Sequence, residues 1–100
     1  MNRKEIAIDF AKSLNHEDIE KIILYGSVAR GDDNEDSDID VLVLTRDIDK
    51  VEEDIHSKAN KILLKTWESI SVKIISADHY NKFRTIPFFK NIDREGILIG

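Results

Sequence analysis

Two aspartates stand at the start of an apolar run that has the composition of a buried strand. The run Asp38–Leu44 reads DIDVLVL and is continuously apolar after its first three residues, a pattern typical of a strand covered on both faces. Because side chains alternate along a strand, Asp38 and Asp40 would point to the same face about 7 Å apart. An unpaired carboxylate in such a place is costly. We therefore expect something positive to compensate this pair.

Strands and helices alternate along the rest of the chain. Apolar residues at three- and four-residue spacing predict helices, and short apolar runs rich in isoleucine predict strands. The predicted elements, in chain order, are a helix ending near Asn15, a strand Lys21–Tyr25, a short helix Ser27–Gly31, the strand Asp38–Leu44, a long helix between Asp49 and Thr66, a strand Ser69–Ser76, a short helix before Pro87 and another at Phe88–Glu95. This order predicts an α/β (α+β) fold over residues 1–100, in which helices flank a small mixed β-sheet of three or more strands within a single domain.

Composition narrows the class of protein. The 100 residues contain no cysteine, which excludes disulfides and thiolate metal sites. No run of eighteen apolar residues occurs, so we expect a cytoplasmic protein without membrane contact. The formal net charge of −5 argues against stable binding of duplex DNA. The three histidines show no paired spacing of the kind that a helical zinc site requires.

A glycine-serine pair lies directly after the strand Lys21–Tyr25. Gly26 allows a sharp turn and a close approach of a phosphate to the backbone. Ser27 is placed to cap the following short helix, whose first amide groups and serine hydroxyl present donors to an anion. A phosphate cradle beside two carboxylates that can share one Mg²⁺ is the arrangement of a nucleoside triphosphate site.

The segment Tyr25–Val43, YGSVARGDDNEDSDIDVLV, joins these features in a specific order. With Gly26-Ser27 separated by ten residues from Asp38-Ile39-Asp40, and with an Ala-Arg-Gly segment ending at Gly31, it resembles the DNA polymerase β-like nucleotidyltransferase superfamily, in particular its minimal, antitoxin-type members. The resemblance is close over Ile22–Val43 and extends to the rest of the chain only in layout.

The resemblance implies a role for each matched residue. Asp38 and Asp40 would be the catalytic residues and would hold Mg²⁺, while Gly26, Ser27 and Arg30 would bind the nucleotide. The implied reaction transfers a nucleoside monophosphate, AMP from ATP, to a hydroxyl of a macromolecular acceptor. Minimal members resembling this chain serve as antitoxins of a helical HEPN-type ribonuclease, which implies such a protein partner. Whether the chain also self-associates stays open.

The chain departs from the family at one position. The third carboxylate of the family is expected in the next strand, but the matching stretch is Val72-Lys73-Ile74-Ile75. A lysine cannot bind Mg²⁺, and its charge would compete with the metal. Three interpretations follow: the alignment is displaced and Glu68 or Asp78 serves instead, a partner chain completes the site, or the domain is a non-catalytic module that binds nucleotide and partner.

Three smaller interpretations concern Arg30, Trp67 and the aromatic residues near the end of the chain. Arg30 could equally form an ion pair with Asp32 or Asp36. Trp67 is expected in the core or at an interface. The aromatic residues interleaved with basic ones in the last quarter are expected to be core anchors or a partner interface rather than a platform for stacking bases.

Overall fold

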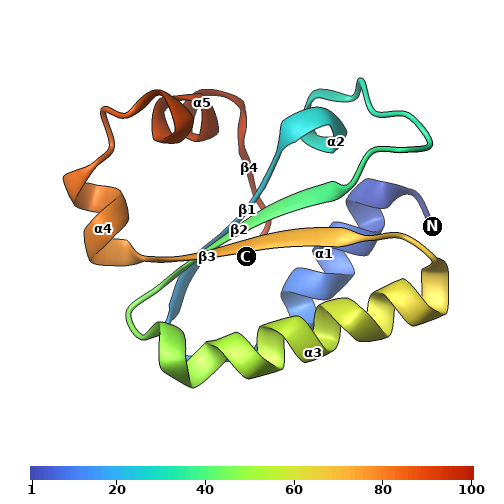
Figure 1. Ribbon diagram of the computed structural model, residues 1–100, viewed down its shortest axis with the longest axis horizontal. Helices are drawn as coiled ribbons and strands as arrows, with labels where there is room; N and C mark the ends of the chain where they lie inside the picture. The colour runs from blue at the N-terminus through green and yellow to red at the C-terminus, as the bar shows by residue number, and fades with distance from the viewer.

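The computed structural model describes all of residues 1–100, and five helices and four strands follow one another along the chain (Figure 1). Their bounds are α1 Arg3–Ser13, β1 Ile19–Tyr25, α2 Gly26–Arg30, β2 Ile39–Thr45, α3 Ile48–Thr66, β3 Ile70–Ser76, α4 Ala77–Lys82, α5 Pro87–Glu95 and β4 Ile97–Leu98. The helices and strands expected from the sequence are confirmed, and their ends differ from the expected ones by at most two residues.

The four strands form one mixed sheet in the order β3-β2-β1-β4. Strand β1 pairs antiparallel with β2, whereas β2 and β3 are parallel and are joined through α3. Parallel neighbours need such a crossover because the chain must return to the same end of the sheet. The predicted small mixed sheet with flanking helices is therefore confirmed.

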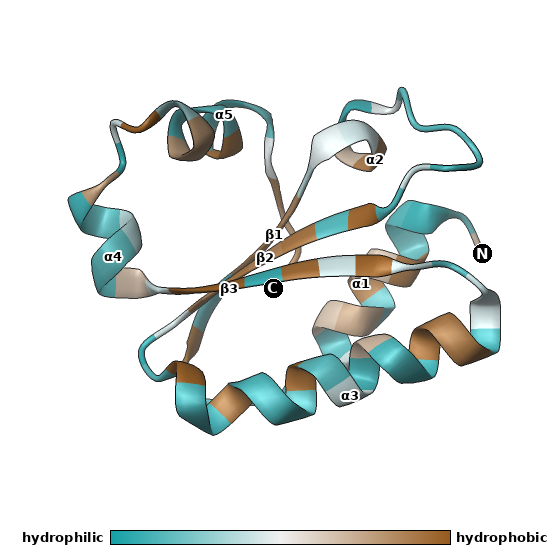
Figure 2. Ribbon diagram, viewed as in Figure 1, coloured by the Kyte–Doolittle hydropathy of each residue, from teal (hydrophilic) through white to brown (hydrophobic).

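Strand β2 lies in the middle of the sheet and is covered on both faces. Its side chains alternate: Val41 and Val43 join the apolar cluster under α1 and α3, while Leu42 and Leu44 join the cluster under α4 and α5. All four are at most 2% exposed. Figure 2 shows strands that are largely brown, whereas teal and brown alternate along α3. By the same alternation, Asp40 belongs to the face of Leu42, at the end where the apolar cover stops.

Strand β4 was not expected, and of the two places expected for Trp67, the core or an interface, the structure excludes the core. Strand β4 was not predicted, because two residues are too few to show a periodicity; it pairs with β1 through Leu98 opposite Ile23. Trp67 is not in the core. It ends α3 in the left-handed conformation, with φ 61°, and its side chain is 81% exposed. No helix in the structure is sufficiently long and apolar to span a membrane.

Candidate active site

The pairing of β1 with β2 brings the glycine-serine turn against the aspartates. Tyr25, the last residue of β1, lies opposite Asp40 in the antiparallel register, so Gly26 follows directly at this end of the sheet. Gly26 has φ +75°, and a Cβ built on it would lie 2.3 Å from Oδ2 of Asp40. Only glycine fits there without displacing the carboxylate. The backbone of the predicted phosphate-binding turn therefore touches the predicted metal ligand.

Asp38 and Asp40 are near enough to influence each other's charge. Asp40 is half-buried in β2. Asp38, the predicted first residue of this strand, is exposed and lies one residue before its observed start at Ile39. Burial and then the charge of Asp38 raise the pKa of Asp40, and the charges of Lys73 and Arg30 oppose this rise. Neither aspartate forms an ion pair within the protein. The pair is a concentration of negative charge for which the chain supplies no direct partner.

The predicted cap at Ser27 is wrong. Helix α2 begins one residue earlier, at Gly26, with Tyr25 in the capping position and no side-chain hydrogen bond to the first turn. The positive φ of Gly26 turns the chain before Ser27 is reached, which places Ser27 inside the helix. Gly31 ends α2 in the left-handed conformation with φ +82°, as predicted.

Arg30 lies at the end of α2 and forms two exposed ion pairs. Its Nε is 3.2 Å from Oδ2 of Asp32 and its Nη1 is 3.4 Å from Oε2 of Glu95. The alternative interpretation of Arg30 as the partner of Asp32 is thus confirmed, and Glu95 is an additional partner. Its charge still lowers the pKa of Asp40, so Arg30 is close enough to act on an anion bound beside that aspartate.

Lys73 occupies the position where the third carboxylate was expected. In the parallel pairing of β2 with β3, Lys73 is the partner of Leu42 and Ser71 is the partner of Asp40. Paired residues of adjacent strands share a face, so Lys73 lies on the face of Asp40, one step along the neighbouring strand. The charge of Lys73 lowers the pKa of Asp40.

Neither carboxylate considered as a substitute completes the site. Glu68 accepts a hydrogen bond from Nε of Arg3 at 2.7 Å. Asp78 lies beyond Ser76, which pairs with Thr45 at the far end of β2, so at about 3.3 Å per residue it is more than about 16 Å along the sheet from Asp40. No three acidic, histidine or cysteine side chains gather closely enough to hold a metal ion.

A cleft adjoins the turn, and no sequence motif predicted it directly. Its volume is about 240 Å³, and its lining includes Tyr25, Gly26 and Arg30 on one side with Phe88 and Asn91 of α5 on the other. Phe88 packs edge-on against Tyr25 with ring centroids 5.8 Å apart. Burial and the charge of Asp40 raise the pKa of Tyr25 to about 12, so its phenol stays protonated at neutral pH. In the sequence, only the aromatic residues interleaved with basic ones in the last quarter of the chain pointed to the α5 side of this cleft.

The carboxylates of Asp38 and Asp40 suit a hard cation that takes its remaining ligands from water and substrate. Two carboxylates with no ion-pair partners supply oxygen atoms, and the glycine turn against Asp40 leaves no side chain between the backbone and the metal ligand. Mg²⁺ is usually held by one or two carboxylates together with water and substrate phosphates. These residues fit such an ion, provided that the substrate supplies the remaining ligands.

Two solved structures share the fold of this chain. A toxin–antitoxin structure with AMP-PNP matches all of this chain and 73% of its own chain, with a TM-score of 0.64 at 19% identity. A substituted form of the MntA–HpeT toxin–antitoxin gives a TM-score of 0.60 at 18% identity, with the same coverage. At such identities the likeness concerns the fold alone.

The family follows from the sequence comparisons. Residues 8–99 match the family model described as polymerase beta, nucleotidyltransferase. A protein of Methanocaldococcus jannaschii named "Putative protein adenylyltransferase" is 35% identical over 99% of both chains, and a second protein of that organism with the same description is 29% identical over 95% of this chain and 96% of its own. The chain belongs to the polymerase beta nucleotidyltransferase family, and it is a minimal nucleotidyltransferase.

Proposed function

We propose that this protein transfers AMP from ATP to a hydroxyl group of another protein in a Mg²⁺-dependent reaction. The observation that carries the proposal is the contact between the turn and the metal ligand: the backbone of Gly26 lies against the carboxylate of Asp40, and Asp38 is close enough to raise the pKa of that carboxylate. A triphosphate held at the turn would therefore meet a cation held by the two aspartates. Two relatives named as adenylyltransferases support AMP as the transferred group.

In this proposal each residue has a defined task. Asp38 and Asp40 hold the ion, which when bound neutralises charge on the phosphates and on the departing pyrophosphate. Gly26 lets a phosphate approach the backbone, Ser27 offers its hydroxyl, and Arg30 offers a positive charge near Asp40. The acceptor oxygen forms a bond to the α-phosphorus while the bond from that phosphorus to pyrophosphate breaks. With Lys73 in place of a carboxylate, the acceptor's proton passes to solvent or to a group of the acceptor protein.

The proposed protein partner is a helical HEPN-type toxin, for which this chain would be the antitoxin. Structures of toxin–antitoxin complexes share the fold. The end of α3 also exposes Leu64 and Trp67, whose side chains are 72% and 81% accessible. Adjacent exposed apolar side chains of this size commonly mark a surface that another protein covers. A partner would in addition provide the acceptor hydroxyl, which so small a chain is poorly equipped to recognise alone.

The transfer can be tested with ATP labelled at either end of the triphosphate. The protein would be incubated with Mg²⁺, the candidate toxin, and ATP carrying the label on the α- or on the γ-phosphate. Nucleotidyl transfer attaches the α-label and never the γ-label to the acceptor. Transfer of α-label that disappears in Asp38→Asn and Asp40→Asn is the expected result. Label that persists in the double variant would refute the proposal, and attachment of γ-label would indicate phosphoryl transfer instead.

One observation favours a second candidate function. Lys73 on the face of Asp40 removes the third carboxylate, which fits a module that binds nucleotide and neutralises its partner by contact alone. The double variant Asp38→Asn with Asp40→Asn separates the two functions in cells that express the toxin. Loss of neutralisation supports the transferase, whereas full neutralisation by a variant that still binds the toxin supports the binding module.

A further inference from the structure

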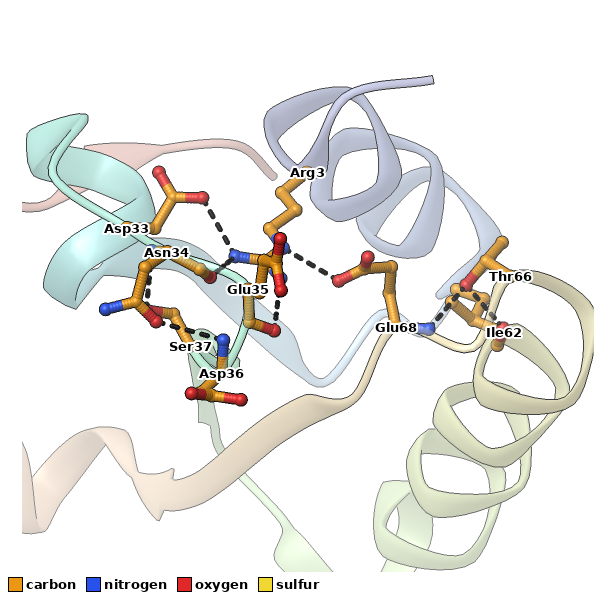
Figure 3. Close-up of polar contacts among 9 residues, drawn as sticks. All are labelled: Arg3, Asp33, Asn34, Glu35, Asp36, Ser37, Ile62, Thr66 and Glu68. Carbon is orange, nitrogen blue, oxygen red and sulfur yellow. Dashed lines mark hydrogen bonds and ion pairs between the residues drawn. The ribbon is translucent and has the colours of Figure 1, made fainter.

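A single arginine at the start of α1 joins two distant segments of the chain. Arg3 donates from Nε to Oε2 of Glu68 at 2.7 Å, from Nη1 to Oδ2 of Asp33 at 3.0 Å, and from Nη2 to the carbonyl of Glu35 at 3.1 Å. Nη1 also donates to the carbonyl of Asn34. Figure 3 shows the guanidinium between the acidic loop and Glu68. All three guanidinium nitrogens are thus used, and the side chain is only 16% exposed.

The segment that Arg3 holds leads directly into Asp38. Within it, residues 34–37 form a turn closed by their own hydrogen bonds: Asn34 N–H to Ser37 Oγ at 3.0 Å, Asp36 N–H to Asn34 Oδ1 at 2.9 Å, and Ser37 N–H to the Asn34 carbonyl at 3.1 Å. Asp38 is the next residue. The position of Asp38 therefore depends on where this turn is held.

Ile39, the residue after Asp38, is held close to Glu68. The N–H of Ile39 donates to the carbonyl of Ser69 at 2.9 Å, and Ser69 directly follows Glu68, the other partner of Arg3. Asp38 is consequently flanked by one anchor before it and one after it, and both converge on the pair formed by Arg3 and Glu68. Asp40 needs no such support because it lies within β2.

The negative charge of the loop makes its attachment to Arg3 important. The loop 32–38 carries five acidic residues and no basic one, so its own repulsion favours an open conformation. Arg30 reaches Asp32 at its beginning. Across residues 33–37, the only ion pair is the one that Arg3 forms with Asp33. Without Arg3, the charge of Asp33 would have no basic partner, and the hydrogen bonds to the carbonyls of Asn34 and Glu35 would be lost.

We propose that Arg3 is a positioning residue for the metal site, holding the loop so that Asp38 faces Asp40. The proposal rests on the proposed function, because it assigns Asp38 a metal to hold. Groups that orient metal ligands from outside the ligand set typically change metal affinity by about 10–100-fold when removed. Arg3 is thus expected to act on Mg²⁺ binding without touching nucleotide or metal.

The test compares Arg3→Ala and Arg3→Lys with Arg46→Ala. Arg46 is a matched control because it also contacts a carbonyl, that of Glu17, and a carboxylate, that of Asp18, but it follows the opposite end of β2. Two quantities are measured: amide hydrogen exchange of residues 34–37, and the Mg²⁺ concentration at half-saturation for binding of a non-hydrolysable ATP analogue. Exchange in β1 and β2 verifies that each variant remains folded.

Arg3→Ala is expected to lose protection in the loop and to raise the Mg²⁺ half-saturation about tenfold. Arg3→Lys should fall between it and the parent, because an ammonium cannot reproduce the planar fork of donors, and Arg46→Ala should match the parent in both quantities. Lost protection with unchanged Mg²⁺ half-saturation would overturn the positioning role, and unchanged protection would overturn the attachment itself. A parent protein that binds the analogue without any Mg²⁺ dependence would instead refute the proposed function, and with it the assigned role.

Discussion

Replacing Gly26 by alanine should lower both the stability of the fold and the rate of nucleotide transfer, and the same substitution at Gly31 separates the two effects. A Cβ at this position would lie 2.3 Å from Oδ2 of Asp40, 3.2 Å from its Cγ and 3.3 Å from its Cβ. Ordinary contact begins at 3.4 Å, so the carboxylate must retreat by about 1.1 Å. Because three atoms of Asp40 are crowded at once, rotation of the carboxylate alone does not relieve the contact. A misplacement of about 1 Å in a catalytic group can lower the rate about 100-fold.

Gly31 provides the matched control. It shares the left-handed conformation, with φ +82°, but a Cβ there would meet nothing within 4 Å. Alanine in this conformation costs about 1–2 kcal/mol at either position, and each kcal/mol lowers the Tm of a chain this size by about 4–8 °C. Both variants should therefore melt earlier, whereas only Gly26→Ala should lose about 100-fold in nucleotide transfer. Equal transfer by the two variants at a temperature where both are folded would refute the assignment of the site.

Three further predictions concern charges beside Asp40. Asp40→Asn should raise the Tm of the metal-free protein at pH 7, since burial and Asp38 raise the pKa of Asp40 and the ionised carboxylate destabilises the fold. The difference in Tm should shrink as the pH falls through that raised pKa, and a Tm below that of the parent at pH 7 would contradict the prediction. Tyr25 should titrate near pH 12 by ultraviolet absorbance, and Asp40→Asn should lower this pKa only in part because burial is the larger cause; full return to the ordinary value would contradict that order. Lys73→Met should lower the Mg²⁺ concentration at half-saturation for binding of an ATP analogue roughly fivefold, because it removes a competing charge worth about 1 kcal/mol. A higher Mg²⁺ concentration at half-saturation would show that Lys73 assists the site.

The sequence predicted the framework of the site because strong local patterns determine it. The apolar strand after Asp40 can be buried only in the sheet centre, and the turn at Gly26 follows a strand of the same kind. Antiparallel pairing of two such strands brings the turn and the aspartate to the same end. The parallel pairing that places Lys73 beside Leu42 was not predicted, since a shift of one residue exchanges the faces of β3 and the sequence does not determine that register.

The remaining features depend on contacts between residues that are distant in the sequence. Nothing local links Arg3 to Glu68 or to Asp33, although together they hold the acidic loop. The α5 side of the cleft likewise depends on how Phe88 packs against Tyr25. The cap at Ser27 was predicted wrongly because residue preference at helix starts does not reveal that Gly26 already adopts a positive φ.

The metal site can be located directly with Mn²⁺ as a substitute for Mg²⁺. Nuclear magnetic resonance of the labelled protein with a non-hydrolysable ATP analogue would record which amide signals the paramagnetic ion broadens. A metal held by the two aspartates should broaden the signals of Gly26 and Ser27 together with those of Asp38 and Asp40, and this broadening should be lost in Asp38→Asn with Asp40→Asn. Broadening instead over the acidic outer face of α3, which Asp49, Glu52, Glu53 and His56 line, would contradict the central claim.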